Sequence, residues 1–196
     1  SKYFRVCAIS VLSAIIVLGT FFMIFAGQYF SKEKISLLTN CATVARAYVL
    51  ERVDSRLLLD RDALAPTLTA LSESTDTVIF LTDTDGKTLL CTEGSSCVVH
   101  STYRVSSKIL RAADSGLYTE MGRLERLYKN PEYTVCQPVR TTEGTVGYLF
   151  VSATNEELRA FLTEMIKIFL ICALMVLLIA FVVTYFVTLK MVRPLR

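Results

Sequence analysis

Two apolar runs without a charged residue bracket this chain and set the strongest limit on its fold. The first extends from Val6 to Phe30 and the second from Ile168 to Leu189. At about 1.5 Å per residue, a helix of either length can cross the hydrocarbon core of a bilayer. The sequence therefore predicts transmembrane helices at 6–30 and 165–189, on either side of a segment with the length of one domain.

Basic residues flank the outer ends of both runs. They are Lys2, Arg5, Lys190, Arg193 and Arg196. Cytoplasmic flanks of membrane helices favour Lys and Arg. Residues 1–5 and 190–196 are therefore predicted to be cytoplasmic and residues 31–164 extracellular, which makes the chain a two-pass protein of the cell membrane.

Three other classes of protein are disfavoured by the same features. A cleaved signal peptide would have an apolar core of about 7–15 residues and a small-residue cleavage site, whereas the first run is longer. Neither run has an ionisable residue at its centre, so a transporter or channel is not expected. The formal net charge of +3 comes from the flanks of the runs, so no nucleic-acid partner is expected.

The segment between the runs changes from a helical to a strand-like pattern. Apolar residues at three- and four-residue spacing continue the first helix over Ser31–Leu59, and Leu64, Leu68 and Leu71 mark a second helix that tolerates Pro66 only near its first turn. The expected strands are 77–82, 87–91, one within 117–127, 132–139 and 145–152, with a third helix over 106–113 capped by Ser106. The predicted fold class is α+β, with an antiparallel sheet of about five strands backed by helices.

The last predicted strand leads directly into the second apolar run. Asn155 is a good N-cap, and Glu156 and Glu157 suit the positive end of a helix dipole. Nothing after them breaks a helix until Pro194. One stiff helix is therefore predicted to join the external domain to the cytoplasm, with Asn155 and Pro194 marking the two ends of a signal-transmitting rod.

The order of these elements resembles the PAS-like extracellular sensors of bacterial receptors, called Cache or PDC domains. The resemblance is carried by the hairpin turn Asp83-Thr84-Asp85-Gly86, by Cys136-Gln137-Pro138-Val139 and by the strand Gly144–Val151 that runs into a membrane span. In addition, Met191-Val192-Arg193-Pro194-Leu195 looks like the start of a HAMP linker. Each motif is weak alone, but their order and their spacing relative to the two spans are specific.

The resemblance implies the sensing and spanning portion of a larger membrane receptor, a two-component sensor histidine kinase that acts as a parallel homodimer. In such kinases the phosphorylated histidine and the ATP-binding domain follow the HAMP linker, so ATP, Mg²⁺ and a response regulator are expected only for the full-length protein. His100 lies in the external segment and is not that phosphoacceptor. No catalytic residue and no cofactor are expected in this chain.

Three other readings remain open from the sequence. A methyl-accepting chemoreceptor and a diguanylate cyclase can carry the same sensor module, and a purely structural two-span protein would transmit no signal. A phosphoacceptor helix, a heptad hairpin or a cyclase domain beyond Arg196 would distinguish these receptors.

Four cysteines lie in the external segment, where disulfides are permitted: Cys41, Cys91, Cys97 and Cys136. Cys91 and Cys97 bracket a short polar loop and are predicted to pair, with Cys136 as a rival partner. The spacing from Cys91 through Cys97 to His100 is not a recognised zinc pattern, so no metal is expected and His100 is interpreted as a loop residue.

The resemblance also implies a small-molecule pocket between the sheet and its covering loops, for a ligand that is not identified. The candidate lining residues are Tyr103, Arg104, Tyr118, Arg123, Arg126 and Tyr133. Arg and Tyr can bind carboxylates and ring faces, although each also has a plain role in packing or solvation. Asp83 and Asp85 are explained by the turn they occupy, and no hydrolytic motif is present.

Overall fold

The computed structural model describes residues 2–52, 61–93, 97, 100, 102–154 and 156–192. The chain forms two compact units. We call Ser31–Asn155 the sheet unit, and we call Ser1–Phe30 together with Glu156–Arg196 the helical unit. The predicted signal-transmission residues Asn155 and Pro194 lie outside the described residues.

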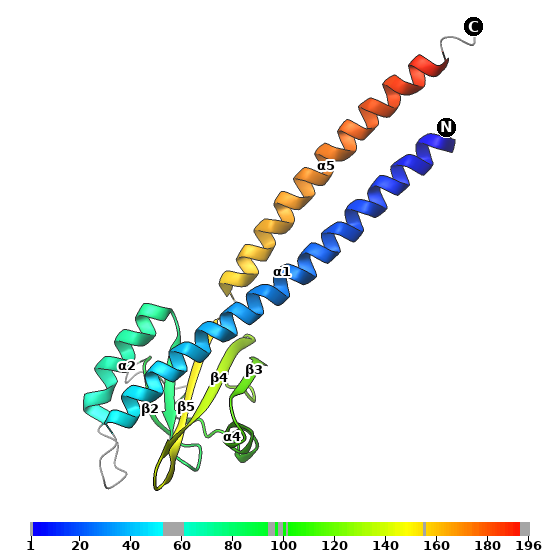
Figure 1. The fold of residues 1–196 in the computed structure, drawn as a ribbon. Helices are drawn as coiled ribbons and strands as arrows, with labels where there is room; N and C mark the ends of the chain where they lie inside the picture. The colour runs from blue at the N-terminus through cyan, green and yellow to red at the C-terminus, as the bar shows by residue number, and fades with distance from the viewer. Residues whose placement is uncertain are drawn as a thin grey trace. The chain divides into compact units, whose positions relative to one another are not determined.

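The sheet unit is built on one antiparallel sheet with the strand order β2-β1-β5-β4-β3 (Figure 1). The strands are β1 (Val78–Thr82), β2 (Thr88–Cys91), β3 (Tyr118–Gly122), β4 (Glu132–Thr141) and β5 (Gly144–Thr154). Each neighbouring pair is antiparallel. The predicted α+β fold with a five-stranded antiparallel sheet is therefore confirmed.

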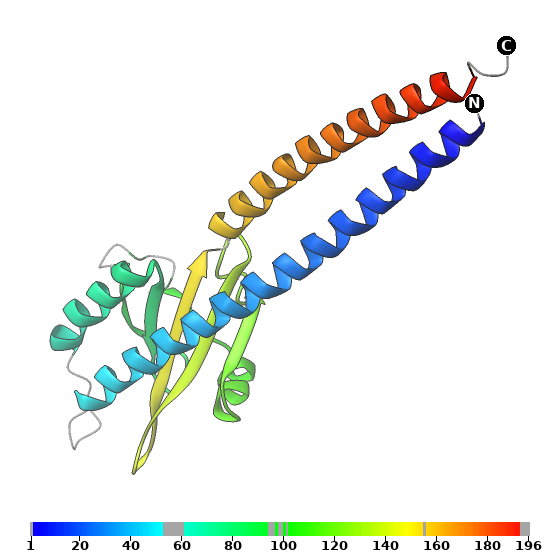
Figure 2. The same ribbon diagram turned by 45° about the horizontal axis from the view of Figure 1, so that its top comes forward.

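Four helices accompany the sheet in the described residues: α1 (Lys2–Glu51), α2 (Arg61–Thr75), α4 (Ser107–Asp114) and α5 (Glu156–Val192). The second half of α1 crosses the sheet in both views (Figures 1 and 2). Two hydrogen bonds attach it there. Ser31 Oγ and Tyr133 Oη are 2.7 Å apart, and Gln137 Nε2 donates to Thr43 Oγ1 at 3.2 Å. The predicted continuation of the first helix beyond the apolar run is confirmed as far as Glu51, and residues 53–59 of that prediction lie outside the described residues.

Strand pairing assigns side chains to the two faces of the sheet, because residues opposite each other in a ladder point to the same side. Phe80, Phe150 and Cys136 pair across β1, β5 and β4 and share the face covered by α4. Their neighbours Ile79, Val151 and Val135 point to the face covered by α1 and α2. These six side chains have no exposed surface, so the centre of the sheet is buried on both faces.

The hairpin between β1 and β2 has the turn chemistry expected for Asp83 to Gly86. The Asp83 carboxylate accepts the backbone N–H of Asp85 at 2.9 Å and that of Lys87 at 2.8 Å. Gly86 has φ +80°, and its carbonyl accepts the N–H of Val105 at 2.9 Å. A Cβ at Gly86 would lie 2.3 Å from the Val105 carbonyl oxygen, so glycine is required there for space as well as for its backbone angle.

Replacing Asp83 by Ala is expected to lower the free energy of unfolding by about 1 kcal/mol, because two backbone N–H groups lose their acceptor at a turn that water reaches. Asp85→Ala is the matched control. The Asp85 side chain is exposed, and we expect its removal to change stability by less than about 0.5 kcal/mol. Urea unfolding followed by tyrosine fluorescence measures both, and equal losses would contradict the assigned role of Asp83.

Pro138 lies in β4, where the sequence predicts an edge or a bulge. β4 lies between β5 and β3, but β3 pairs only with the stretch from Glu132 to Cys136. Pro138 therefore lies beyond the end of β3, where its missing N–H costs the sheet nothing on that side. The register against β5 shifts close by, between Val139 and Arg140, so the position agrees with the predicted edge or bulge.

Two details of the predicted helices are wrong. Ser106 occupies the N-cap position of α4 without a side-chain cap bond, because its hydroxyl instead donates to the Glu125 carboxylate at 2.5 Å. A charged acceptor makes the stronger bond. Pro66 lies one turn further into α2 than expected. Pro66 is exposed. Water can therefore reach the backbone carbonyl one turn earlier, which has no N–H partner because proline lacks one.

Two helices in the described residues are long and apolar enough to cross a membrane, within Ile9–Glu51 and Arg159–Val187, and the helical unit holds the first of them as far as Phe30 and all of the second. Large apolar side chains on these helices are exposed. In α5, for example, Ile171 is 63% exposed and Phe186 is 64% exposed. Within the unit the two helices touch at Gly19, where an added Cβ would lie 2.4 Å from the Phe169 ring. Small residues permit such close approach between membrane helices.

Candidate functional site

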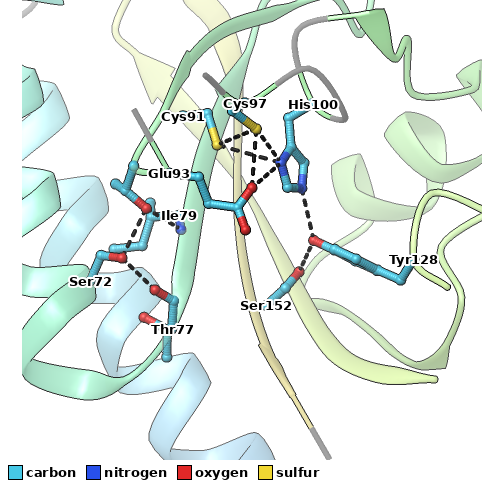
Figure 3. A network of polar contacts seen from close by, with 10 residues as sticks. Ser72, Thr77, Ile79, Cys91, Glu93, Cys97, His100, Tyr128 and Ser152 are labelled. Carbon is cyan, nitrogen blue, oxygen red and sulfur yellow. Dashed lines mark hydrogen bonds and ion pairs between the residues drawn. The ribbon is translucent and has the colours of Figure 1, made fainter. Parts of the chain in front are cut away.

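Four side chains with metal-binding or redox-active atoms converge on the α4 face of the sheet (Figure 3). We call Cys91, Glu93, Cys97 and His100 the four-donor cluster. Cys91 ends β2 opposite Phe80, which places it on this face. Cys97 Sγ lies 3.3 Å from Cys91 Sγ, 2.8 Å from His100 Nδ1 and 3.2 Å from Glu93 Oε2. His100 Nδ1 lies 3.5 Å from Cys91 Sγ and 3.3 Å from Glu93 Oε2.

The other nitrogen of His100 connects the cluster to the central strand. Its Nε2 is 3.2 Å from Tyr128 Oη, and Tyr128 donates to Ser152 Oγ at 2.7 Å (Figure 3). Ser152 Oγ is also 3.0 Å from Thr134 Oγ1 on β4. We call His100, Tyr128 and Ser152 the polar relay. Together with the contact between Cys91 Sγ and His100 Nδ1, it links the edge strand β2 to β5 without involving β1, which lies between them.

The aromatic core fixes the position of His100. The imidazole is 1% exposed, and its centroid lies 4.7 Å from that of the Phe80 ring. Phe80 in turn stacks on Phe150, with centroids 4.7 Å apart and planes 3° from parallel. Tyr128 contacts the imidazole edge-on at 5.7 Å. The β1–β5 register that pairs Phe80 with Phe150 therefore builds the floor of the cluster.

Tyr128 reaches His100 from an unusual turn. Leu124, Glu125 and Arg126 have φ of +40°, +52° and +73°, a region that side-chain-bearing residues rarely adopt. The turn closes with the N–H of Tyr128 donating to the Arg123 carbonyl at 3.1 Å. Leu124 is buried in the core, which holds the turn in place. Such backbone strain persists where surrounding packing enforces it and is frequent at functional sites.

Burial sets the protonation of the groups in the site. It raises the pKa of the Cys91 thiol to about 12 and raises the pKa of Tyr128 well above its usual value. Burial also lowers the pKa of His100, and the nearby Glu93 carboxylate only partly opposes that shift. Near neutral pH the Cys91 thiol, the phenol and the imidazole are therefore uncharged when no cation is bound.

This chemistry allows two outcomes for the thiols. Two sulfurs, an imidazole nitrogen and a carboxylate oxygen are the donor types that Zn²⁺ takes. The sulfurs of Cys91 and Cys97 are also close enough to form the predicted disulfide after a small shift, although both are free thiols in this structure. The rival partner Cys136 lies three strands from Cys91, about 14 Å at the usual strand spacing, beyond the reach of a disulfide.

Two members of the site were missed from the sequence. Glu93 lies between the two cysteines, and its position inside a Cys-to-His run was the available signal. Tyr128 is 28 residues from His100, and no spacing rule links it to the cluster. His100 itself was interpreted as a loop residue, whereas it is buried and has polar contacts at both ring nitrogens.

The six predicted ligand-binding residues do not come together. Tyr133 faces α1, whereas Tyr118 points to the opposite face of the sheet and donates to Glu120 at 2.7 Å. Tyr103 packs against the α4-side core and donates to the Leu124 carbonyl at 3.2 Å. The remaining candidates are exposed residues, Arg104, Arg123 and Arg126. The structure thus divides the set between two faces of the sheet and the surface.

No protein-family model and no curated protein matches the chain. Solved structures do match its fold. The ligand-binding domain of the Campylobacter jejuni chemoreceptor Tlp3 in complex with L-valine is 14% identical, covers 79% of this chain and 66% of its own length, and gives a TM-score of 0.54. The sensory domain of Tlp3 (CcmL) gives a TM-score of 0.53 at 14% identity, with the same two coverages.

The sensor domain of the V. cholerae histidine kinase DctB is also matched, at 16% identity over 65% of this chain and 57% of that chain, with a lower TM-score of 0.40. This chain spans less than two thirds of the length of several matched structures. At these identities the likeness shows a shared architecture. The chain shares its fold with the sensory and ligand-binding domains of Tlp3.

Proposed function

We propose that this chain is the sensing and membrane-spanning portion of a transmembrane receptor. One observation carries the proposal. The central strand β5, bonded to β1 on one side and β4 on the other, ends at Thr154, and the apolar helix α5 begins at Glu156. A rearrangement in the middle of the sheet therefore has a short covalent route into a helix long enough to cross a bilayer.

Exposed apolar surface supports the membrane location. Leu170 and Phe186 are 61% and 64% exposed, which is unfavourable in water for a helix apolar on all sides. The basic flanks of both helices favour cytoplasmic ends, so the sheet unit lies outside the cell in this proposal. Signals then pass from an extracellular ligand through α5 to the cytoplasm.

The receptor we propose is a sensor histidine kinase that works as a homodimer, with α5 leading into a HAMP linker and a kinase that uses ATP and Mg²⁺ to phosphorylate a response regulator. A chemoreceptor is the second candidate, favoured by the Tlp3 sensory domains that share the fold. The gene sequence beyond Arg196 tests both. A phosphoacceptor-histidine helix followed by an ATP-binding domain would establish the kinase, and a long coiled-coil hairpin would establish the chemoreceptor. A gene with no cytoplasmic output domain of any kind after Arg196 would refute the receptor proposal.

Inserting Gly-Gly between Thr154 and Asn155 of the full-length protein is expected to abolish the response of its cytoplasmic output to the external signal. Two glycines lengthen the covalent connection and add conformational freedom to it, so movement of β5 no longer displaces α5. The readout is phosphorylation of the response regulator, or kinase control if the output is a chemoreceptor.

The matched control is Gly-Gly inserted after Glu143, in the exposed hairpin between β4 and β5. This insertion lengthens a turn at the far end of the same strand and leaves its connection to α5 intact. We expect near-normal signalling from it. A junction variant that signals as well as the hairpin variant would exclude transmission through the connection from β5 to α5.

A further inference from the structure

The separations within the four-donor cluster match the edges of a small coordination tetrahedron. Zinc bonds of about 2.0–2.3 Å at tetrahedral angles place donor atoms about 3.3–3.8 Å apart. Five of the six separations are 2.8, 3.2, 3.3, 3.3 and 3.5 Å, and all four donor atoms lie within 4.8 Å of one another. Outward shifts of a few tenths of an ångström would open room for one ion at the centre.

A disulfide would account for only half of this arrangement. It explains why Cys91 and Cys97 are close, but it gives no reason for a buried imidazole to turn Nδ1 toward both sulfurs. It also gives no reason for the Glu93 carboxylate to approach both the Cys97 sulfur and His100 Nδ1 (Figure 3). A cation at the centre accounts for all four, because each offers it a lone pair.

The surroundings of His100 resemble the outer shell of a metal site. A metal-bound imidazole usually donates its second N–H to an oxygen, which fixes the tautomer and the ring orientation. With Nδ1 directed at the cluster, the Nε2–H donates a hydrogen bond to Tyr128 Oη. The Tyr128 hydroxyl in turn donates a hydrogen bond to Ser152 Oγ. The Phe80 ring against the imidazole restricts its rotation.

We propose that Cys91, Glu93, Cys97 and His100 bind one Zn²⁺ ion through two thiolates, one carboxylate oxygen and Nδ1. Binding releases the proton of each thiol to solvent, because the thiolate is the ligand. Two sulfur donors select a borderline-soft ion of the zinc type over Mg²⁺ or Ca²⁺, which prefer an all-oxygen shell. Each ligand contributes one bond, so the coordination number of four is filled by the protein.

A bound ion would join two parts of the sheet unit. It ties Cys91 at the end of β2 to His100, and the polar relay then reaches Ser152 on β5. If the chain is a receptor as proposed above, the ion is a ligand whose binding can shift β5 through the polar relay, and β5 is the strand followed by α5. This consequence rests on the proposed function, whereas the zinc site itself does not.

The first test titrates the full chain in detergent micelles with Zn²⁺ alone, after treatment with a phosphine reductant and a chelator. Calorimetry is expected to give one ion per chain. Co²⁺ is expected to give the strong visible absorption of a tetrahedral ion and a thiolate-to-cobalt charge-transfer band in the near ultraviolet. A stoichiometry well below one, or a Co²⁺ spectrum without the charge-transfer band, would overturn the site.

Ligand variants and matched controls locate the ion. Cys91→Ser, Cys97→Ser and His100→Gln are each expected to weaken binding by more than the roughly 10–100-fold expected for Tyr128→Phe, which removes only an outer partner. Cys41→Ser and Cys136→Ser also remove external thiols that are buried, and they are expected to bind Zn²⁺ normally. Circular dichroism of each metal-free variant checks that it is folded. Normal binding by a folded Cys97→Ser variant would refute the assignment.

The competing disulfide is tested on protein taken directly from membranes. Peptide mass spectrometry without reduction is expected to show free Cys91 and Cys97. Complete conversion of this pair to a disulfide would overturn the zinc site in the living cell.

Signalling by the full-length protein is a separate readout. Zn²⁺ binding with no change in output would leave the site standing and overturn its role as signal. If the wild-type protein bound no Zn²⁺ but still responded to another stimulus, the zinc site would be overturned and the receptor proposal would stand.

Discussion

Replacing Phe80 by Ala is expected to lower the free energy of unfolding of the sheet unit by about 3–5 kcal/mol. Phe80 has no exposed surface and lies in β1 between the rings of Phe150 and His100, each with its centroid 4.7 Å away. Truncation leaves a cavity in the core on the α4 face of the sheet and removes a stacked aromatic pair, which contributes about 0.5–1.5 kcal/mol beyond burial alone. Urea unfolding followed by the fluorescence of the chain's nine tyrosines measures the loss.

Met121→Ala is the control for Phe80→Ala. Met121 lies on the edge strand β3 and is 57% exposed, so its truncation is expected to change stability by less than about 0.5 kcal/mol. Phe80→Leu adds a graded case, because it restores much of the volume without the ring and should lose less than Phe80→Ala. If Phe80→Ala cost no more than Met121→Ala, the stack would not be part of the stabilising core.

The order and type of the elements were predictable because each has a local signal. Alternation marks β4, a short run of β-branched and aromatic residues marks β5, and the helical period continues from the first apolar run into the sheet unit. The turn from Asp83 to Gly86 was predictable for the same reason, since Asp and Gly have intrinsic turn preferences. These features depend on residues close together in the sequence.

The site was less predictable because it depends on contacts between distant segments. The left-handed turn at Leu124–Arg126 that aims Tyr128 at His100 contains no glycine, so nothing local signals it. Ser106 was expected to cap a helix, but Glu125 from that same turn binds its hydroxyl. The opposite facing of Tyr118 and Tyr133 follows from the β3–β4 register, which a single strand does not specify.

Replacing Gly147 by Val is expected to lower the free energy of unfolding by about 3 kcal/mol, at the upper end of the usual cost of overpacking. Gly147 lies in β5, and a Cβ there would be 2.2 Å from the carbonyl oxygen of Thr82 on β1. That contact is to backbone, so no side chain can rotate away and the two central strands must separate. Gly147→Ala meets the same oxygen with fewer atoms and should lose less. Urea unfolding with tyrosine fluorescence compares the two.

Thr145→Val separates this steric cost from the effect of placing valine in β5. Thr145 lies two residues earlier in the same strand and is only partly buried, so the same new side chain should change stability by less than about 0.5 kcal/mol there. Equal losses at the two positions would show that β1 and β5 approach less closely at Gly147 than described. A selective loss at Gly147 would show that β5, the strand followed by α5, approaches the backbone of β1 closely at this residue. In the receptor that we propose, movement between β1 and β5 is then limited at this residue, and a wider separation there should alter the output as well as the stability.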